Sequence, residues 1–160
     1  MRVKSGFTLV EILIMAVVLG ILAAIVIPQF SRAGTKAKES SLMSNLQAVR
    51  SQIELYKIQH NDNLPGTQGT VDFVAAMTSK TNRDGEVGTT AAHKFGPYMQ
   101  SIPVNPFNDL NTVELNGTAG DDTAGWNFVT TGVDADADAC LFQADDSKVN
   151  PVDGSAHTTY

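Results

Sequence analysis

The sequence predicts an α+β fold in which a long N-terminal helix packs on a small antiparallel β-sheet. Three observations lead to this prediction. An apolar run extends from Phe7 to Ile27, apolar residues recur at helical spacing from Leu42 to Tyr56, and strand-like segments come late, from Thr112 onward. The 160 residues suffice for one domain, at about 100–200 residues per domain.

The first element is the apolar run from Phe7 to Ile27. At about 1.5 Å per residue it forms a helix of about 31 Å, which matches a hydrocarbon core of about 30 Å. Glu11 is its one ionisable residue, and a carboxylate in a membrane span costs roughly 2.5–3.5 kcal/mol on insertion scales. A secretory signal has a shorter apolar core of about 7–15 residues and is cleaved after it. A plain membrane anchor accounts for the length of the run but gives no reason for Glu11.

A basic leader from Met1 to Gly6 precedes the run, which opens with Gly-Phe-Thr-Leu-Val-Glu and ends with the segment from Gly20 to Phe30. This pattern resembles the N-terminus of type IV prepilins and of type II secretion pseudopilins. The resemblance implies a pilin-like, lollipop-shaped subunit. It also implies that a membrane peptidase cleaves between Gly6 and Phe7 and methylates the new N-terminus on Phe7, so that the apolar helix stays on the mature protein.

Glu11 acquires a partner from that cleavage, because the new amine on Phe7 lies four residues before it. A charge of opposite sign offsets much of the cost of a carboxylate in a low dielectric. The partner is either the N-terminus of the same chain or that of a neighbouring subunit, and the resemblance favours the neighbour. The alternative is that Glu11 snorkels to the membrane interface from its place near the helix start.

The helix continues beyond the membrane segment. Pro28 stands where the apolar run ends, so we expect a kink in the helix there. We predict that Pro28 and Glu11 both take part in the assembly of subunits. One apolar stripe follows at spacings of three and four, typical of an amphipathic helix: Leu42, Leu46, Val49, Ile53 and Tyr56. The predicted parts are a leader at 1–6, a transmembrane or filament-core helix at 7–27, its amphipathic continuation at 28–62, and a globular domain with a polar tail at 63–160.

Within the globular part, Val71 to Met77 predicts a short second helix. The loop from Gly96 to Asn108 contains three prolines, which exclude a central strand. It resembles the loop before the sheet in major pseudopilins, and we expect it to dock three side chains on the core: Tyr98, Ile102 and Phe107.

The predicted strands run from Thr112 to Leu115, from Trp126 to Thr130 and from Ala139 to Phe142, because their residues alternate or are rich in strand formers. We expect them to form an antiparallel sheet of three or four strands on the helix stripe. The tail from Asp145 to Tyr160 is polar and is assigned to no element.

Composition narrows the function. A formal charge of −6 argues against nucleic-acid binding, which needs a basic footprint. The single cysteine, Cys140, allows no intramolecular disulfide, unlike the cysteine pair of many type IV pilins, and we expect it to serve in packing. Three scattered histidines, His60, His93 and His157, are expected on the surface. We see no catalytic constellation and expect no enzyme.

One acidic segment suggests a metal. Asp134, Asp136 and Asp138 take positions 1, 3 and 5 of a calcium loop. The segment departs from an EF-hand, because Ala139 stands in place of the glycine at position 6 and Asp145 in place of the glutamate at position 12, and a looser site of oxygen ligands stays open. Major pseudopilins are known for a calcium site in this part of the chain, so the resemblance suggests calcium, but the spacing of these residues does not match that site and a solvated acidic turn is preferred.

Two classes of function remain. In the first, the chain polymerises into a filament, preferably the pseudopilus of type II secretion and otherwise a type IV pilus for adhesion, motility or DNA uptake. The resemblance implies these partners: copies of the chain, the prepilin peptidase and methyltransferase, an inner-membrane assembly platform with its ATPase, and minor pilins or pseudopilins. It implies one pass through the bacterial inner membrane with a periplasmic C-terminal domain. In the second class, the chain is a monotopic membrane-anchored module that binds a periplasmic ligand.

Overall fold

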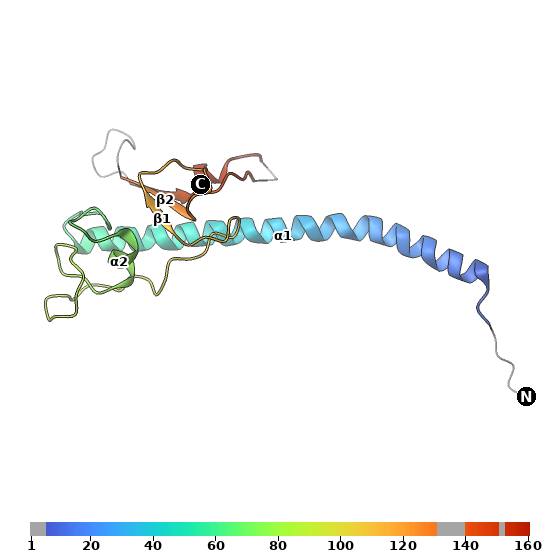
Figure 1. The fold of residues 1–160 in the computed structure, drawn as a ribbon, viewed down its shortest axis with the longest axis horizontal. Helices are drawn as coiled ribbons and strands as arrows, with labels where there is room; N and C mark the ends of the chain where they lie inside the picture. The colour runs from blue at the N-terminus through green and yellow to red at the C-terminus, as the bar shows by residue number, and fades with distance from the viewer. Residues whose placement is uncertain (1–5, 131–139, 151–152) are drawn as a thin grey trace, which may run out of the picture. The chain divides into compact units, whose positions relative to one another are not determined.

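The computed structural model describes residues 6–130, 140–150 and 153–160. Its elements, in chain order, are α1 (Leu9–Gln59), α2 (Phe73–Thr78), β1 (Val113–Leu115), β2 (Trp126–Val129), β3 (Leu141–Ala144) and a 3-10 turn, η1 (His157–Thr159) (Figure 1). The predicted α+β class, a long N-terminal helix with a small sheet, is confirmed. The chain divides into two compact units, one up to Ala37 and one from Lys38 to Tyr160.

The first unit consists of the start of α1. The helix begins after Thr8 and contains Gly20 and Pro28 within its bounds. Its large apolar side chains are exposed, from 43% at Val26 to 82% at Leu9. By length and composition, α1 is the one helix in the described part of the chain that could cross a membrane.

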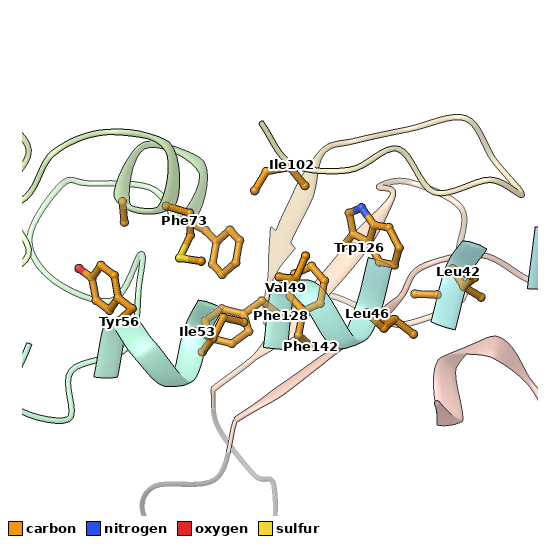
Figure 2. Packing of buried hydrophobic residues seen from close by; sticks show 13 residues of the cluster. Leu42, Leu46, Val49, Ile53, Tyr56, Phe73, Ile102, Trp126, Phe128 and Phe142 are labelled. Atoms are coloured by element: carbon orange, nitrogen blue, oxygen red, sulfur yellow. The ribbon is translucent and has the colours of Figure 1, made fainter. Parts of the chain in front are cut away.

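The second unit has its core on the remainder of α1. The five residues of the predicted stripe are each between 0 and 2% exposed, and they pack with Phe73 of α2, Ile102 and the sheet (Figure 2). The helix ends before Asn61 and Asp62, whose positive φ angles of 54° and 64° leave the helical region.

The sheet has the order β1-β2-β3. β2 and β3 are antiparallel, with Phe128 opposite Phe142, but β1 and β2 are parallel, with Val113 opposite Trp126. The prediction of a wholly antiparallel sheet is therefore wrong, and the sheet is mixed.

The connection from β1 to β2 explains the difference. Its last residues return to the start of β1, because the backbone N–H groups of Gly125 and Trp126 both donate to the carbonyl of Thr112 at 3.1 Å. A side chain at position 125 would not fit, since a Cβ there would lie 2.2 Å from the Leu110 carbonyl oxygen. A parallel pair normally needs a longer connection than this one, so a short connection favours the antiparallel prediction. The alternation of apolar and polar side chains does not depend on strand direction and could not correct it.

The two smaller predictions for this unit are confirmed. The second helix starts slightly later than expected, because the Asp72 carboxylate caps it by accepting from the Ala75 N–H at 2.6 Å. The loop from Gly96 to Asn108 contains neither helix nor strand. Ile102 is 4% exposed, and Tyr98 and Phe107 pack against the core from the same loop.

Candidate functional site

The predicted processing site lies in the non-helical stretch before α1. Phe7 is 71% exposed, and a Cβ added at Gly6 would meet no other atom within 4 Å. Cleavage between Gly6 and Phe7 and methylation of Phe7 stay predictions. A peptidase could reach the bond between Gly6 and Phe7, because this stretch is exposed and not helical. The described residues leave room for a side chain at position 6, so a requirement for glycine there would come from the peptidase.

Glu11 takes part in a reciprocal cap at the start of α1. The Glu11 N–H donates to Thr8 Oγ1 at 3.2 Å, and the Thr8 N–H donates to Glu11 Oε2 at 3.3 Å. This is a capping box, which the sequence pattern Thr-x-x-Glu could have indicated. Because Thr8 follows Phe7 directly, an amine on Phe7 would be next to the residue that already binds the Glu11 carboxylate.

From Ile12 to Ile27 the surface of α1 is apolar on every side. A helix that is apolar all round is stable when lipid or other protein surrounds it. Among the described residues, none buries this apolar part of α1. Pro28 is helical in its backbone, and its role in assembly stays a prediction.

The predicted calcium residues Asp134, Asp136 and Asp138 lie outside the described residues. Elsewhere, the structure brings together a different acidic trio, which we call the acidic cluster: Glu114, Asp121 and Asp145. One oxygen of each carboxylate lies within 4.8 Å of the others. They come from β1, from the connection between β1 and β2, and from the residue that follows β3.

Asp145 is the buried member of the acidic cluster. Its Oδ1 accepts from the Gly120 N–H at 2.7 Å and its Oδ2 from the Ala124 N–H at 2.9 Å. Burial raises the pKa of Asp145, although these backbone N–H groups oppose the rise. The Thr123 hydroxyl and N–H lower the pKa of exposed Asp121.

Asn127 is the neighbour of Glu114 across the β1–β2 pair. It is fully buried, and its Nδ2 donates to the Gly117 carbonyl at 2.8 Å. Its Oδ1 has no hydrogen-bond partner among the described residues. The acidic cluster itself offers three carboxylate oxygens, the kind of ligand that calcium prefers.

The tail contains residues that sequence reasoning missed. His157 is fully buried between Glu39 and Asp146, so its expected surface position is wrong, and the same is true of fully buried His60. The Arg50 guanidinium donates to the carbonyl oxygens of Phe142 and Tyr160. No periodic signal could have found these partners, because they lie far apart in the chain.

Cys140 fits the packing role expected of it. It is partly buried against the hydrophobic core. Burial raises the pKa of the Cys140 thiol, which disfavours the reactive thiolate.

Comparison with known proteins points in one direction. The chain is 32% identical over 125 residues to type II secretion system core protein G of Pseudomonas aeruginosa, a match that covers 74% of this chain and 79% of that protein. It is 29% identical over 143 residues to the protein of the same name from Aeromonas hydrophila, covering 79% and 95%. The Escherichia coli K12 protein is 28% identical over 136 residues, covering 78% and 92%. No protein-family model and no solved structure matches significantly.

Proposed function

The chain belongs to the type II secretion system core protein G family, the major pseudopilins, and we propose how its residues carry out that role. The protein is a structural subunit of the pseudopilus, a pilus-like filament. One observation carries this conclusion: from Leu9 to Ile27 the helix α1 is apolar all round, with a single carboxylate, Glu11, in its first turn. Such a surface is suited to lipid before assembly and to the helices of other subunits afterwards.

The proposed assembly starts with cleavage after Gly6 by a prepilin peptidase, which also methylates Phe7. Glu11 then binds the Phe7 amine of a neighbouring subunit. This pairing offsets the cost of placing both charges in the filament core and fixes the axial position of each new subunit. The capping box holds the Glu11 carboxylate beside Thr8 of its own chain, so the neighbour's amine would have to reach it at this end of α1.

The proposed setting is the bacterial inner membrane. The subunit is anchored by α1, with its C-terminal domain in the periplasm. Its proposed partners are an assembly platform with its ATPase, which supplies the work of extraction, and minor pseudopilins. A structural role without catalysis is part of this proposal.

The test is filament formation by Glu11→Ala with the secretion machinery present. We expect the processed protein to accumulate in the membrane, because removing a charge eases insertion. Filaments, measured by shearing and electron microscopy, are expected to be absent, because the neighbour's amine loses its partner at a cost of several kcal/mol. Glu54→Ala is the matched control, since this carboxylate is also on α1 and its side chain is 63% exposed.

Three outcomes would argue against parts of this proposal. Normal filaments from Glu11→Ala would reject the pairing role. A chain that forms no filaments even without mutation would favour the anchored binding module. Surface pili in a strain that lacks the secretion system would favour a type IV pilus subunit.

Calcium binding is a second proposed property, favoured by the acidic cluster and by the nearby strand residue Asn127, whose buried Oδ1 has no hydrogen-bond partner among the described residues. Glu114, Asp121 and Asp145 would hold the ion. Bound calcium would supply positive charge that joins β1, the β1–β2 connection and the end of β3.

The calcium proposal predicts that chelation lowers the thermal midpoint of the full chain in detergent micelles. Ligand linkage gives about 2.7 kcal/mol when free ion is about 100-fold above Kd. Asp121→Asn should abolish the response, and the exposed control Asp153→Asn should keep it. An identical midpoint with calcium and with chelator would contradict the proposal. A response lost in Asp136→Asn but kept in Asp121→Asn would move the ion to the segment first predicted.

A further inference from the structure

Two histidines are fully buried in the second unit, and their surroundings differ. His60 Nδ1 lies 2.8 Å from the Tyr56 carbonyl oxygen, and its Nε2 lies 2.9 Å from the Thr81 hydroxyl. The carbonyl needs a donor, whereas a hydroxyl can donate or accept. A neutral ring with one hydrogen, on Nδ1, therefore satisfies both contacts of His60.

His157 faces a carboxylate on each side. Its Nε2 lies 2.7 Å from Glu39 Oε1, and its Nδ1 lies 2.6 Å from Asp146 Oδ1. An ionised carboxylate only accepts hydrogen bonds, so both ring nitrogens must donate if both carboxylates are ionised. A ring with one hydrogen would leave a nitrogen lone pair facing a carboxylate oxygen in a buried site, which is costly.

The other contacts of Asp146 show where the hydrogen belongs. Asp146 Oδ1 also accepts from the Lys148 N–H at 3.1 Å, and its Oδ2 accepts from Asn105 Nδ2 at 3.0 Å. Both oxygens are therefore already used as acceptors, which fits a carboxylate and disfavours the acid. The second hydrogen is better placed on the ring of His157.

The other groups near His157 do not change the assignment of the second hydrogen to its ring. The Tyr160 hydroxyl donates to Glu39 Oε2 at 3.5 Å, so the second Glu39 oxygen also accepts. The Phe107 ring lies 4.2 Å from the His157 ring, centroid to centroid, and Lys38 Nζ lies over the Phe107 ring at 5.8 Å from its centroid. Arg50 is bound to the carbonyl oxygens of Phe142 and Tyr160.

We propose that His157 is a doubly protonated imidazolium that bridges Glu39 and Asp146, and that its proton fastens the C-terminal segment, residues 153–160, to α1. Glu39 belongs to α1, and His157 is the first residue of η1. Loss of the proton breaks one of the two bridges and leaves a nitrogen lone pair facing a carboxylate oxygen, which weakens the attachment of the segment to α1. The direction is fixed by the chemistry: removing the proton at higher pH loosens the segment, whereas both contacts of His60 are satisfied by a neutral ring.

The first test measures the hydrogens directly by nitrogen NMR of the histidine rings, using the full chain in detergent micelles at neutral pH. Both ring nitrogens of His157 should carry a hydrogen, whereas His60 should show one protonated and one bare nitrogen and serves as the reference within the same sample. A bare nitrogen on His157 would overturn the proposal. No variant is needed, so this result cannot be confused with misfolding.

The second test follows release of the segment through backbone hydrogen exchange at His157 and Tyr160, whose N–H groups donate to the carbonyls of Lys148 and His157. Exchange is compared across about pH 5 to 8 and above, after correction for the base catalysis seen in unstructured peptides. In the unmutated chain, exchange should accelerate with pH by on the order of tenfold, the worth of a charged hydrogen bond. In His157→Gln it should be fast throughout and show no further acceleration.

His93→Gln is the matched control, because His93 is partly exposed and its Nδ1 contacts the Thr90 hydroxyl. It should behave as the unmutated chain. The same corrected pH dependence in His157→Gln and in the unmutated chain would overturn the proposed role of the proton.

Discussion

The two parts of α1 have similar helical backbones and opposite surroundings. From Leu9 to Ile27 the large apolar side chains are 43–82% exposed, whereas the stripe from Leu42 to Tyr56 is 0–2% exposed. The difference follows from the arrangement of apolar residues around the helix. They surround the first part, and they occupy one side of the second.

This difference separates two sources of stability. The second part of α1 is covered by its own domain (Figure 2), so its apolar residues contribute to folding. The large apolar residues of the first part are exposed in the described structure, so we expect them to contribute to contacts with lipid or with other subunits. Substitutions in the two parts should therefore change different measurements.

The largest expected effect on folding is that of Leu46→Ala. Truncating a buried leucine leaves a cavity and costs about 2–5 kcal/mol. The adjacent part of the same helix offers a control in Met43→Ala, since Met43 is 50% exposed and surface changes stay within about 0.5 kcal/mol. Unfolding of the full chain in micelles by denaturant measures both. Equal losses for the two variants would contradict the division between buried and exposed sides.

Leu19→Asp should produce the converse result. An aspartate in the middle of a membrane span costs roughly 2.5–3.5 kcal/mol on insertion scales, so the membrane-bound fraction should fall. Unfolding of the C-terminal domain should not change, because Leu19 is 66% exposed and belongs to the first unit. Cell fractionation and denaturant unfolding test the two halves of this prediction. A destabilised domain would show that the parts of α1 are energetically coupled.

The last prediction concerns Tyr56. Its substitution should change stability least at neutral pH and should have a separate effect on stability in alkali. Burial, with a contribution from Tyr98, raises the pKa of Tyr56 to about 12. The folded state thus retains a proton that the unfolded state loses near pH 10, so this residue reduces stability as the pH rises from about 10 to about 12. Tyr56→Phe should flatten the loss, measured by phenolate absorption and circular dichroism. Ionisation of Tyr56 in the folded protein near pH 10 would contradict its burial.

Local sequence patterns predicted much of the molecule. The length of α1, its apolar stripe, the short helix and the docked loop from Gly96 to Asn108 all follow from periodicity and from residues such as proline that exclude regular structure. The Thr8–Glu11 capping box was equally readable from its spacing. These features depend on residues within a few positions of one another, which is why a linear sequence displays them.

Other features became visible only when distant residues met. Nothing in the spacing of Glu114, Asp121 and Asp145 marks a cluster, and the tail offered no pattern to predict that Asp146 is buried. The expectation of surface histidines was wrong for His157 because its partner Glu39 is 118 positions away. A buried polar residue is stable when its hydrogen bonds are satisfied, and the sequence does not name the partners.

By itself, the sequence determined a helix with two kinds of surface, the α+β class and the resemblance to pseudopilins, because each rests on short-range order along the chain. The tertiary structure alone decided that β1 runs parallel to β2, that Asp145 lies with Glu114 and Asp121, and that His157 joins the tail to α1. The physical reason is the same in each case. Strand direction and the pairing of buried charges are properties of contacts in space, and residues far apart in the chain make those contacts.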